Sequence, residues 1–133
     1  MSNPSKRIGT AAETKVSRFL NMHGLRTERR ALAGSNDEGD LRAILPNGEE
    51  VTLEVKAGKQ TQNYPRSKLD EWKRQTIVEG ENSGCRPALI IVRYRRSFED
   101  NTEVWLPNSL WGGINGWTML YINQFADMAW TMA

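Results

Sequence analysis

The sequence predicts an α/β fold, in which a central mixed β-sheet is flanked by helices. Three observations lead to this prediction: a long segment with helical periodicity, a pair of strand-like runs around a Pro-Asn-Gly turn, and a second helical segment followed by a short apolar run. Strands interrupted by helices form a mixed sheet with helices on its faces. The predicted elements are a helix over residues 5–22, strands over 25–32, 40–45 and 50–57, a helix from Ser67 onward and a strand over 88–92.

The first helix is predicted from apolar residues that recur every three or four positions, such as Ile8, Ala12 and Val16. Gly24 is its predicted end, because glycine readily adopts the positive φ of a helix C-cap. The second helix is predicted to begin at Ser67, where Asp70 three residues later gives an approximate capping box. Both helices therefore have a sequence signal for one of their ends.

The segment 101–133 differs in character from the rest of the chain. It holds four of the five tryptophans and no lysine or arginine. Strands are predicted near Val104–Leu106 and Trp117–Ile122, and Asn123 is a candidate cap for a last short helix. Aromatic residues without basic neighbours favour packing on the core or at a dimer interface over stacking on unpaired bases. We therefore expect one domain over 1–133, with a catalytic core in 1–100 and an aromatic-rich extension in 101–133.

Composition excludes several classes of protein. The single cysteine excludes an internal disulfide framework and indicates the cytoplasm (host cytoplasm if the source is viral), and one histidine is too few for a zinc finger. No apolar run approaches the roughly 20 residues of a membrane span, so no membrane partner is expected. Residues 1–35 carry seven basic and two acidic side chains, whereas 101–133 carry two acidic and no basic ones. A surface that follows DNA phosphates is therefore predicted in the first hundred residues.

The most informative motif is Asp40, then thirteen residues, then Glu54-Val55-Lys56. On a hairpin this spacing brings two carboxylates and a lysine together, and alternation puts Glu54 and Lys56 on one face of the strand. Hard oxygen ligands beside a lysine suit metal-assisted phosphodiester hydrolysis with Mg²⁺, for which Mn²⁺ can substitute. Asp40, Glu54 and the Val55 carbonyl are the predicted ligands, and Lys56 would orient water or neutralise developing charge. Glu13 is predicted to join them from the first helix, as a ligand of a second ion or of metal-bound water.

Other interpretations of these residues stay open. Alternating charges on an exposed strand would also produce Glu-x-Lys, and Glu13 would equally suit a solvated helix surface. Arg29 and Arg30 flank the loop before Asp40, so they either contact phosphate or are simply solvated. The polar loop after the hairpin could touch DNA or be an ordinary connector; its candidate DNA contacts are Lys59, Tyr64 and Arg66.

With these motifs the chain resembles the PD-(D/E)xK nucleases of restriction-endonuclease-like fold, and within them the archaeal-type and viral Holliday junction resolvases. The resemblance covers about residues 5–96. The matching stretches are Lys6-Arg7-Ile8-Gly9 with Glu13, Leu20 to Gly24, Arg29-Arg30, Gly34-Ser35, Gly39-Asp40, Leu53-Glu54-Val55-Lys56, Gln62-Asn63-Tyr64 and the helix from Ser67. The family often has proline where this chain has Gly39, and the segment after Asn101 has no counterpart in it.

The resemblance implies a homodimer that cuts four-way DNA junctions and recognises branch geometry through phosphates. By position, Glu13, Asp40, Glu54 and Lys56 match the catalytic residues. Ser35 matches a loop serine that assists catalysis, although it would equally suit a plain loop. Lys6, Arg7, Arg29 and Arg30 fall in matching basic stretches, of which Arg7 and Arg30 match backbone contacts. A nuclease of the same fold that cuts flaps, ends or duplex DNA is the alternative, as is a non-catalytic DNA-binding subunit.

Overall fold

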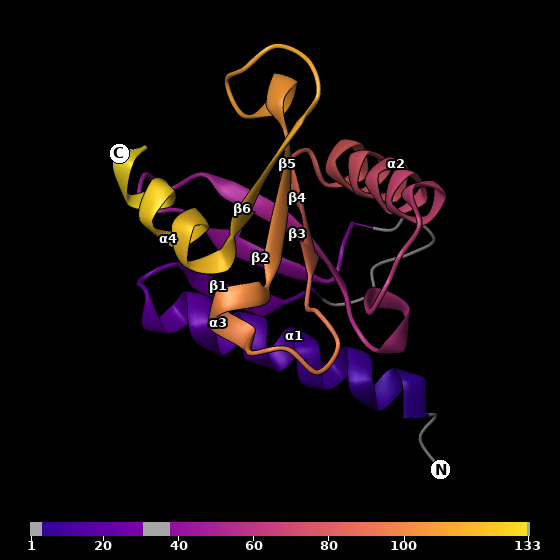
Figure 1. The fold of residues 1–133 in the computed structure, drawn as a ribbon. Coiled ribbons are helices and arrows are strands. Elements are labelled where there is room, and N and C mark those ends of the chain that lie inside the picture. Colours follow the sequence, from indigo (N-terminus) through magenta and orange to yellow (C-terminus); the bar gives the residue numbers. More distant parts are fainter. Residues whose placement is uncertain (1–3, 31–37, 133) are drawn as a thin grey trace.

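A six-stranded mixed sheet in the order β1-β2-β3-β4-β5-β6 forms the centre of the molecule, with helices on both faces (Figure 1). The structure, a computed structural model, describes residues 4–30 and 38–132, with 4–6 as backbone only. The strands are β1 (Arg26–Arg29), β2 (Leu41–Ile44), β3 (Glu50–Lys56), β4 (Arg86–Ile91), β5 (Glu103–Pro107) and β6 (Trp117–Tyr121). The helices are α1 (Pro4–Met22), α2 (Arg66–Ser83), α3 (Phe98–Asn101) and α4 (Ile122–Thr131), with 3-10 turns η1 (Lys59–Thr61) and η2 (Asn108–Leu110). The predicted α/β fold with a mixed sheet is confirmed.

One strand pair in this sheet is parallel. β1, β2 and β3 form an antiparallel meander, and β4, β5 and β6 form a second one. β3 and β4 join the two meanders in parallel, with Leu53 opposite Ala88 and Lys56 opposite Ile91. A parallel pair requires a crossover connection, and α2 supplies it. The carboxyl ends of β3 and β4 therefore lie side by side.

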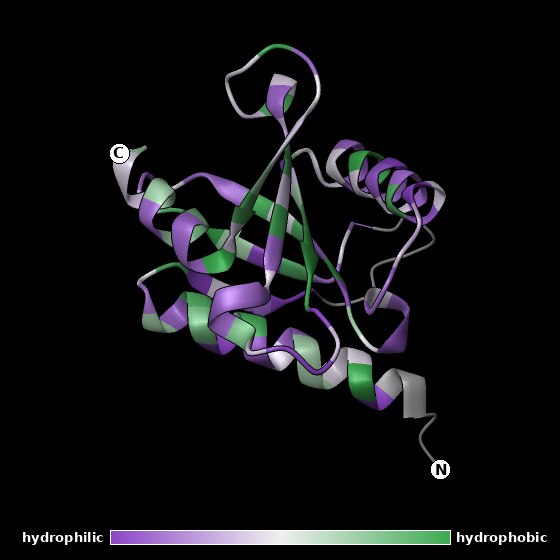
Figure 2. Cartoon of the chain, viewed as in Figure 1, coloured by the Kyte–Doolittle hydropathy of each residue, from purple (hydrophilic) through white to green (hydrophobic). Residues whose placement is uncertain are grey.

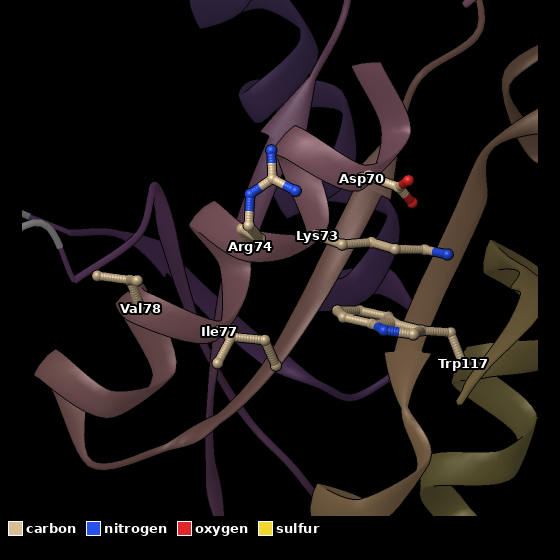
Figure 3. Close-up of a pocket in the computed structure, with 6 residues that line it drawn as sticks. All are labelled: Asp70, Lys73, Arg74, Ile77, Val78 and Trp117. Atoms are coloured by element: carbon tan, nitrogen blue, oxygen red, sulfur yellow. The ribbon is translucent and has the colours of Figure 1, made fainter. Parts of the chain in front are cut away.

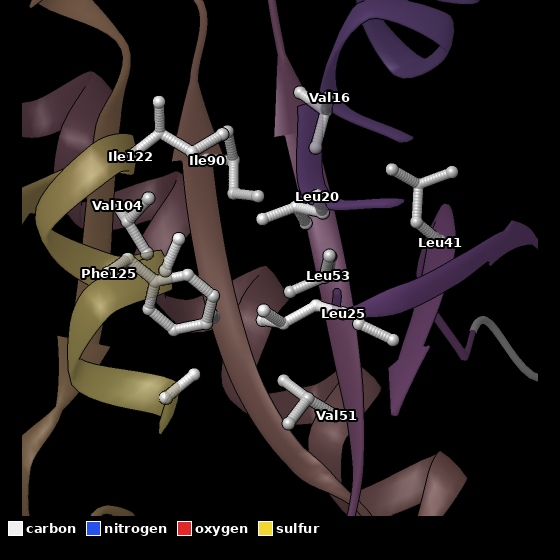
Figure 4. Packing of buried hydrophobic residues seen from close by; sticks show 14 of the residues in the cluster. Val16, Leu20, Leu25, Leu41, Val51, Leu53, Ile90, Val104, Ile122 and Phe125 are labelled. Carbon is white, nitrogen blue, oxygen red and sulfur yellow. The ribbon is translucent and has the colours of Figure 1, made fainter. Parts of the chain in front are cut away.

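The two faces of the sheet are covered by different helices. Val51 and Leu53 of β3 belong to a large apolar cluster that includes Leu20 of α1 and Phe125 of α4 (Figure 4). Leu89 and Ile91 of β4 instead pack with Trp72 of α2 in a smaller cluster. Apolar residues consequently line the central strands on both sides, as the hydropathy colouring shows (Figure 2). Because side chains alternate along a strand, Glu54 and Lys56 lie on the face that α2 covers.

Two predicted helix starts are wrong: α2 begins one residue earlier than predicted, and Asn123 lies two residues after the observed N-cap of α4. α2 begins at Arg66, with extended Pro65 as its N-cap and no side-chain cap, so Ser67 lies inside the helix. α4 begins at Ile122, and the Tyr121 N–H donates to Gln124 Oε1 at 2.9 Å, so Asn123 is not the cap. α2 thus begins after extended Pro65 without a side-chain cap, whereas at the start of α4 the Gln124 side chain accepts the N–H of extended Tyr121.

The aromatic-rich segment 101–133 continues the sheet and the core. β5 pairs with β4, β6 pairs with β5, and α4 lies against the same face as α1 (Figure 1). Ile122 and Phe125 are fully buried in the large cluster, and the Trp111 indole N–H donates to the Pro87 carbonyl at 2.8 Å. Trp130 is about half exposed but donates to the His23 carbonyl at 2.7 Å. This segment therefore closes the apolar face that α1 leaves uncovered.

Candidate active site

Four of the five residues predicted for catalysis line one cavity at the carboxyl end of β3, with a volume of about 590 Å³. Glu13 comes from α1, Asp40 lies directly before β2, and Glu54 and Lys56 end β3. Gly9 lies on the cavity wall one turn before Glu13, and a Cβ added there would meet open space. A glycine inside a helix costs about 1 kcal/mol relative to alanine, and no packing contact requires this one. Its effect is to keep the cavity open beside the carboxylates.

Asp40 is fixed by the backbone on both of its neighbouring strands. Its N–H donates to the Leu53 carbonyl at 2.9 Å, and its carbonyl accepts from the Arg30 N–H at 3.0 Å. The Val55 N–H donates to Asp40 Oδ2 at 2.9 Å. Val55 was predicted to take part through its carbonyl, and its N–H has the further role of aiming the Asp40 carboxylate at the cavity.

Gly39 sets the backbone conformation of the turn directly before Asp40. Its φ is +97°, and a Cβ there would lie 2.5 Å from Thr52 Oγ1 and 3.3 Å from the Leu53 carbonyl oxygen. The Thr52 hydroxyl donates to the Glu38 carbonyl in the same turn. Proline, whose ring fixes φ near −65°, cannot adopt this conformation. At Gly39 the chain thus turns in a backbone conformation that glycine adopts readily and proline cannot adopt.

Glu54 is the most perturbed acid in the cavity. It is 3% exposed, forms a hydrogen bond with the Asp40 carboxyl group, and has Lys56 Nζ 3.2 Å from its Oε2. Burial, followed by the hydrogen bond and the negative charge of Asp40, raises the pKa of Glu54 to about 10, against the smaller opposing effect of Lys56. Without a bound cation, Glu54 therefore carries a proton at neutral pH that it shares with Asp40.

Glu13 is held from the other side of the cavity. Arg29 Nε lies 3.2 Å from Glu13 Oε1, with the Arg29 side chain about half exposed. Burial raises the pKa of Glu13 and the charge of Asp40 raises it further, while Arg29 lowers it. The predicted phosphate contact Arg29 thus already has an acidic partner at the cavity rim.

The donor set is suited to a hard divalent cation. Asp40 and Glu54 are two carboxyl groups in contact inside a buried site, and a cation in place of their shared proton would remove their repulsion. Within residues 4–30 and 38–132, no group of three or more His, Cys, Asp or Glu side chains is arranged to hold a metal ion. Glu13 is turned toward Arg29 in this arrangement, so the fit is to a site with two carboxylates and backbone oxygen.

The predicted DNA-binding residues do not all gather at the cavity. Lys59 lines it, whereas Arg7 and Arg66 are exposed on α1 and at the start of α2. The Arg30 guanidinium extends instead toward Cys85 Sγ, at 3.8 Å, near the opposite end of β3. Ser35 and the Lys6 side chain lie outside the described residues.

Tyr64 has a structural role, because it connects the loop beside the cavity to the sheet. Its hydroxyl donates to Glu103 Oε1 at 2.5 Å, and its ring packs against Trp72. Burial and this hydrogen bond to Glu103 raise the pKa of Tyr64. Arg93 Nη1 donates to the other Glu103 oxygen at 2.7 Å and its Nε donates to the Thr61 carbonyl at 2.8 Å. The loop that carries Lys59 is therefore braced against β4 and β5.

Two polar residues of α2 also reach the site, and neither was predicted. Gln75 lines the cavity, and Glu79 is buried and adds negative charge near Glu54. The sequence does contain a signal that Glu79 is buried, because Glu79 continues the stripe of Trp72 and Thr76 at helical spacing. An acid at an apolar stripe position indicates a buried polar cluster.

A separate cavity of about 460 Å³ lies on the outer side of α2, against Trp117 of β6 (Figure 3). Lys73 extends over the Trp117 ring, with its Nζ 5.4 Å from the ring centre. None of the residues predicted for catalysis or DNA binding is among the described residues that line it.

Comparison of the sequence with protein-family models and with curated proteins gives no match. Within the described parts of the chain, no helix combines the length and apolar character that crossing a bilayer requires.

Proposed function

We propose that the chain is a Mg²⁺-dependent endodeoxyribonuclease with a restriction-endonuclease-like core, which acts as a homodimer on four-way (Holliday) junctions. The observation that carries the proposal is the buried contact of Asp40 with Glu54, beside Lys56 in one open cavity. The order of helix, three strands, helix and strand supports it as well. Two carboxyl groups in contact beside an open cavity are an arrangement that active sites favour, because it perturbs the pKa of the acids.

Each residue has a distinct role in the proposed reaction. Asp40, Glu54 and the Val55 carbonyl would hold Mg²⁺, which when bound supplies Lewis-acid polarisation of the scissile phosphodiester. Lys56, whose Nζ is already held 3.2 Å from Glu54, places a positive charge where the pentavalent transition state gains negative charge. Glu13, whose pKa is raised by burial, is suited to accept a proton from the attacking water.

The branched substrate rests on the family resemblance alone. A nuclease of the same fold that cuts flaps, ends or duplex DNA is the second candidate, because the same cavity chemistry serves any phosphodiester. A DNA-binding subunit without activity is the third.

One experiment separates these candidates: purified protein with Mg²⁺ is incubated with four-way junction, flap, single-stranded and duplex DNA of matched length. Paired symmetric cuts in the junction, with little cleavage of the other substrates, support the resolvase. Cleavage concentrated on flaps or duplex rejects the junction preference but keeps the nuclease. Binding without cleavage in Mg²⁺ or Mn²⁺ rejects the nuclease.

A further inference from the structure

A second cavity adjoins the active-site cavity and has the opposite charge. It measures about 280 Å³ and shares Ile8, Ala57 and Gly58 with the active-site cavity. We call it the basic groove; its charged lining residues are Lys15, Arg93, Arg95 and Arg96. None of the described residues that line it is acidic.

Three of the four cations in the basic groove are available for a ligand. Arg93 is committed to Glu103 and to the Thr61 carbonyl. Within residues 4–30 and 38–132, no ion pair involves Lys15, Arg95 or Arg96. Arg95 and Arg96 are exposed and Lys15 approaches from α1, so the positive charges come from two separate elements.

The turn that carries these arginines has an uncommon backbone conformation. Arg95 has φ +55°, and among the described residues it is the one non-glycine residue with positive φ. Its guanidinium stacks over the Tyr94 ring at 5.1 Å, and the Arg96 N–H donates to the Arg93 carbonyl at 3.3 Å. Positive φ costs an arginine free energy, and residues held in this way are found preferentially at functional sites. The turn presents Arg95 and Arg96 side by side at the groove.

Gly58 separates the two cavities with bare backbone. It has φ +84°, and a Cβ there would lie 3.3 Å from Ile8 Cγ2. A side chain at this position would press against α1 between the cavities. An extended ligand can therefore pass from the acidic cavity into the basic groove over Ala57 and Gly58.

We propose that the basic groove binds the DNA phosphates next to the scissile one, on the strand that is being cut. This inference rests on the proposed function, because the acidic cavity would then hold the scissile phosphate. A polyanion fits the groove better than a single phosphate does, since the free cations lie on two elements rather than around one point. Phosphate contacts of this kind fix the register of DNA on a protein without reading its sequence.

The test compares two double variants with equal loss of charge. Arg95→Gly with Arg96→Ala removes the free arginines of the turn, and glycine tolerates the positive φ of position 95. The control, Arg26→Ala with Arg74→Ala, removes two exposed arginines from β1 and from the outer side of α2. Dissociation constants for junction and duplex DNA are measured without Mg²⁺ at several salt concentrations, and thermal melts check the fold.

The groove variant is expected to bind both DNAs at least about tenfold more weakly than the wild type. Its slope of log K against log salt should fall by about 1–2, because each neutralised phosphate contributes roughly 0.9. The control should stay within about threefold, and Arg95→Lys with Arg96→Lys should restore most of the affinity. Lys15→Gln, which leaves the turn untouched, should weaken binding in the same direction.

If the groove and control variants bind DNA with equal affinity and Lys15→Gln binds like wild type, the proposed phosphate binding by the basic groove is wrong. The proposed nuclease activity still stands in that case if the wild-type protein cleaves DNA. A wild-type chain that binds no DNA overturns both proposals.

Discussion

Two buried glutamates at the same end of the sheet have opposite surroundings. Glu103 on β5 is 6% exposed and accepts hydrogen bonds from Tyr64, Arg93 and Trp105 at 2.5, 2.7 and 3.1 Å. Glu54 on β3 is 3% exposed, yet it contacts the Asp40 carboxyl group and has Lys56 as its nearby cation. The two glutamates are thus buried to a similar extent, but Glu103 contacts hydrogen-bond donors and Glu54 contacts a second carboxyl group.

This difference separates a structural acid from a candidate catalytic one. Glu103 is surrounded by donors, so its burial is offset within the protein. Glu54 has negative charge nearby from Asp40 and Glu79, so Lys56 compensates its ionised form only in part until a metal cation binds. A perturbed acid beside an open cavity is the pattern typical of an active site.

The largest expected effect is on cleavage. Asp40→Asn or Glu54→Gln should lower the cleavage rate in Mg²⁺ on the order of a thousandfold, because either change removes a carboxylate from the proposed metal site. DNA binding should stay the same or become tighter, since negative charge near phosphates is lost. Glu81→Gln, an exposed acid on α2, is the matched control and should cleave normally. If the two active-site variants cleave at the wild-type rate, the assigned site is wrong.

The next effect is on stability, and it should have opposite signs at the two glutamates. Glu103→Gln should lower the free energy of unfolding by about 3 kcal/mol, because it breaks a buried charge pair with Arg93. Glu54→Gln should raise it in metal-free protein at neutral pH, because wild-type Glu54 must take up a proton when the chain folds and the neutral amide need not. Urea unfolding in EDTA measures both values. Similar losses in the two variants would contradict the comparison.

The turn before Asp40 should respond more moderately. Gly39→Ala is expected to cost about 2 kcal/mol, because a Cβ there adds a 2.5 Å contact with Thr52 to the strain of positive φ. Gly48→Ala, at φ +91° with nothing within 4 Å, controls for the strain alone and should cost about 1 kcal/mol. The Gly39 variant should also lose cleavage activity, since Asp40 is displaced. Equal stability costs would mean that the contact with Thr52 relaxes freely.

Counted per pH unit, the smallest effect is the pH dependence of stability that Glu54 causes. In the unfolded chain Glu54 ionises near its ordinary pKa of 4.5, whereas in metal-free folded protein its pKa is about 10. Between these values the unfolded state binds fewer protons, so the stability due to Glu54 falls as pH rises, by up to about 1.4 kcal/mol per unit. The stability difference between Glu54→Gln and wild type should therefore grow from pH 5 to pH 9. A constant difference would show that Glu54 is ionised throughout.

Local patterns in the sequence predicted the order of the main elements and the residues Glu13, Asp40, Glu54 and Lys56 that line the cavity. The alternation in Glu50–Lys56 and the helical spacing of Ile8, Ala12 and Val16 involve near neighbours only, and both elements are present. The three acids could be placed together because α1 and the β2–β3 hairpin lie close to each other along the chain.

Roles that depend on distant residues could not be predicted. Tyr64 was a candidate DNA contact, but its hydroxyl binds Glu103, 39 residues away. Arg30 was one as well, and its guanidinium approaches Cys85, 55 residues away. The space that a Cβ at Gly39 would need is taken by Thr52, across the hairpin. In each case a tertiary partner that no local pattern reveals decides where the side chain or backbone goes.

The parallel pairing of β3 with β4 also has a consequence for the time course of folding. The β1–β3 meander makes mostly local contacts and can form early, whereas β4 pairs with β3 only after α2 has bridged them. The loop that carries Lys59 is expected to become ordered later still, because it is held in place through Arg93 and Glu103. Asp40, Glu54 and Lys56 leave the ribosome well before residue 103, so we expect the proposed active site to be completed only after β5 has been synthesised.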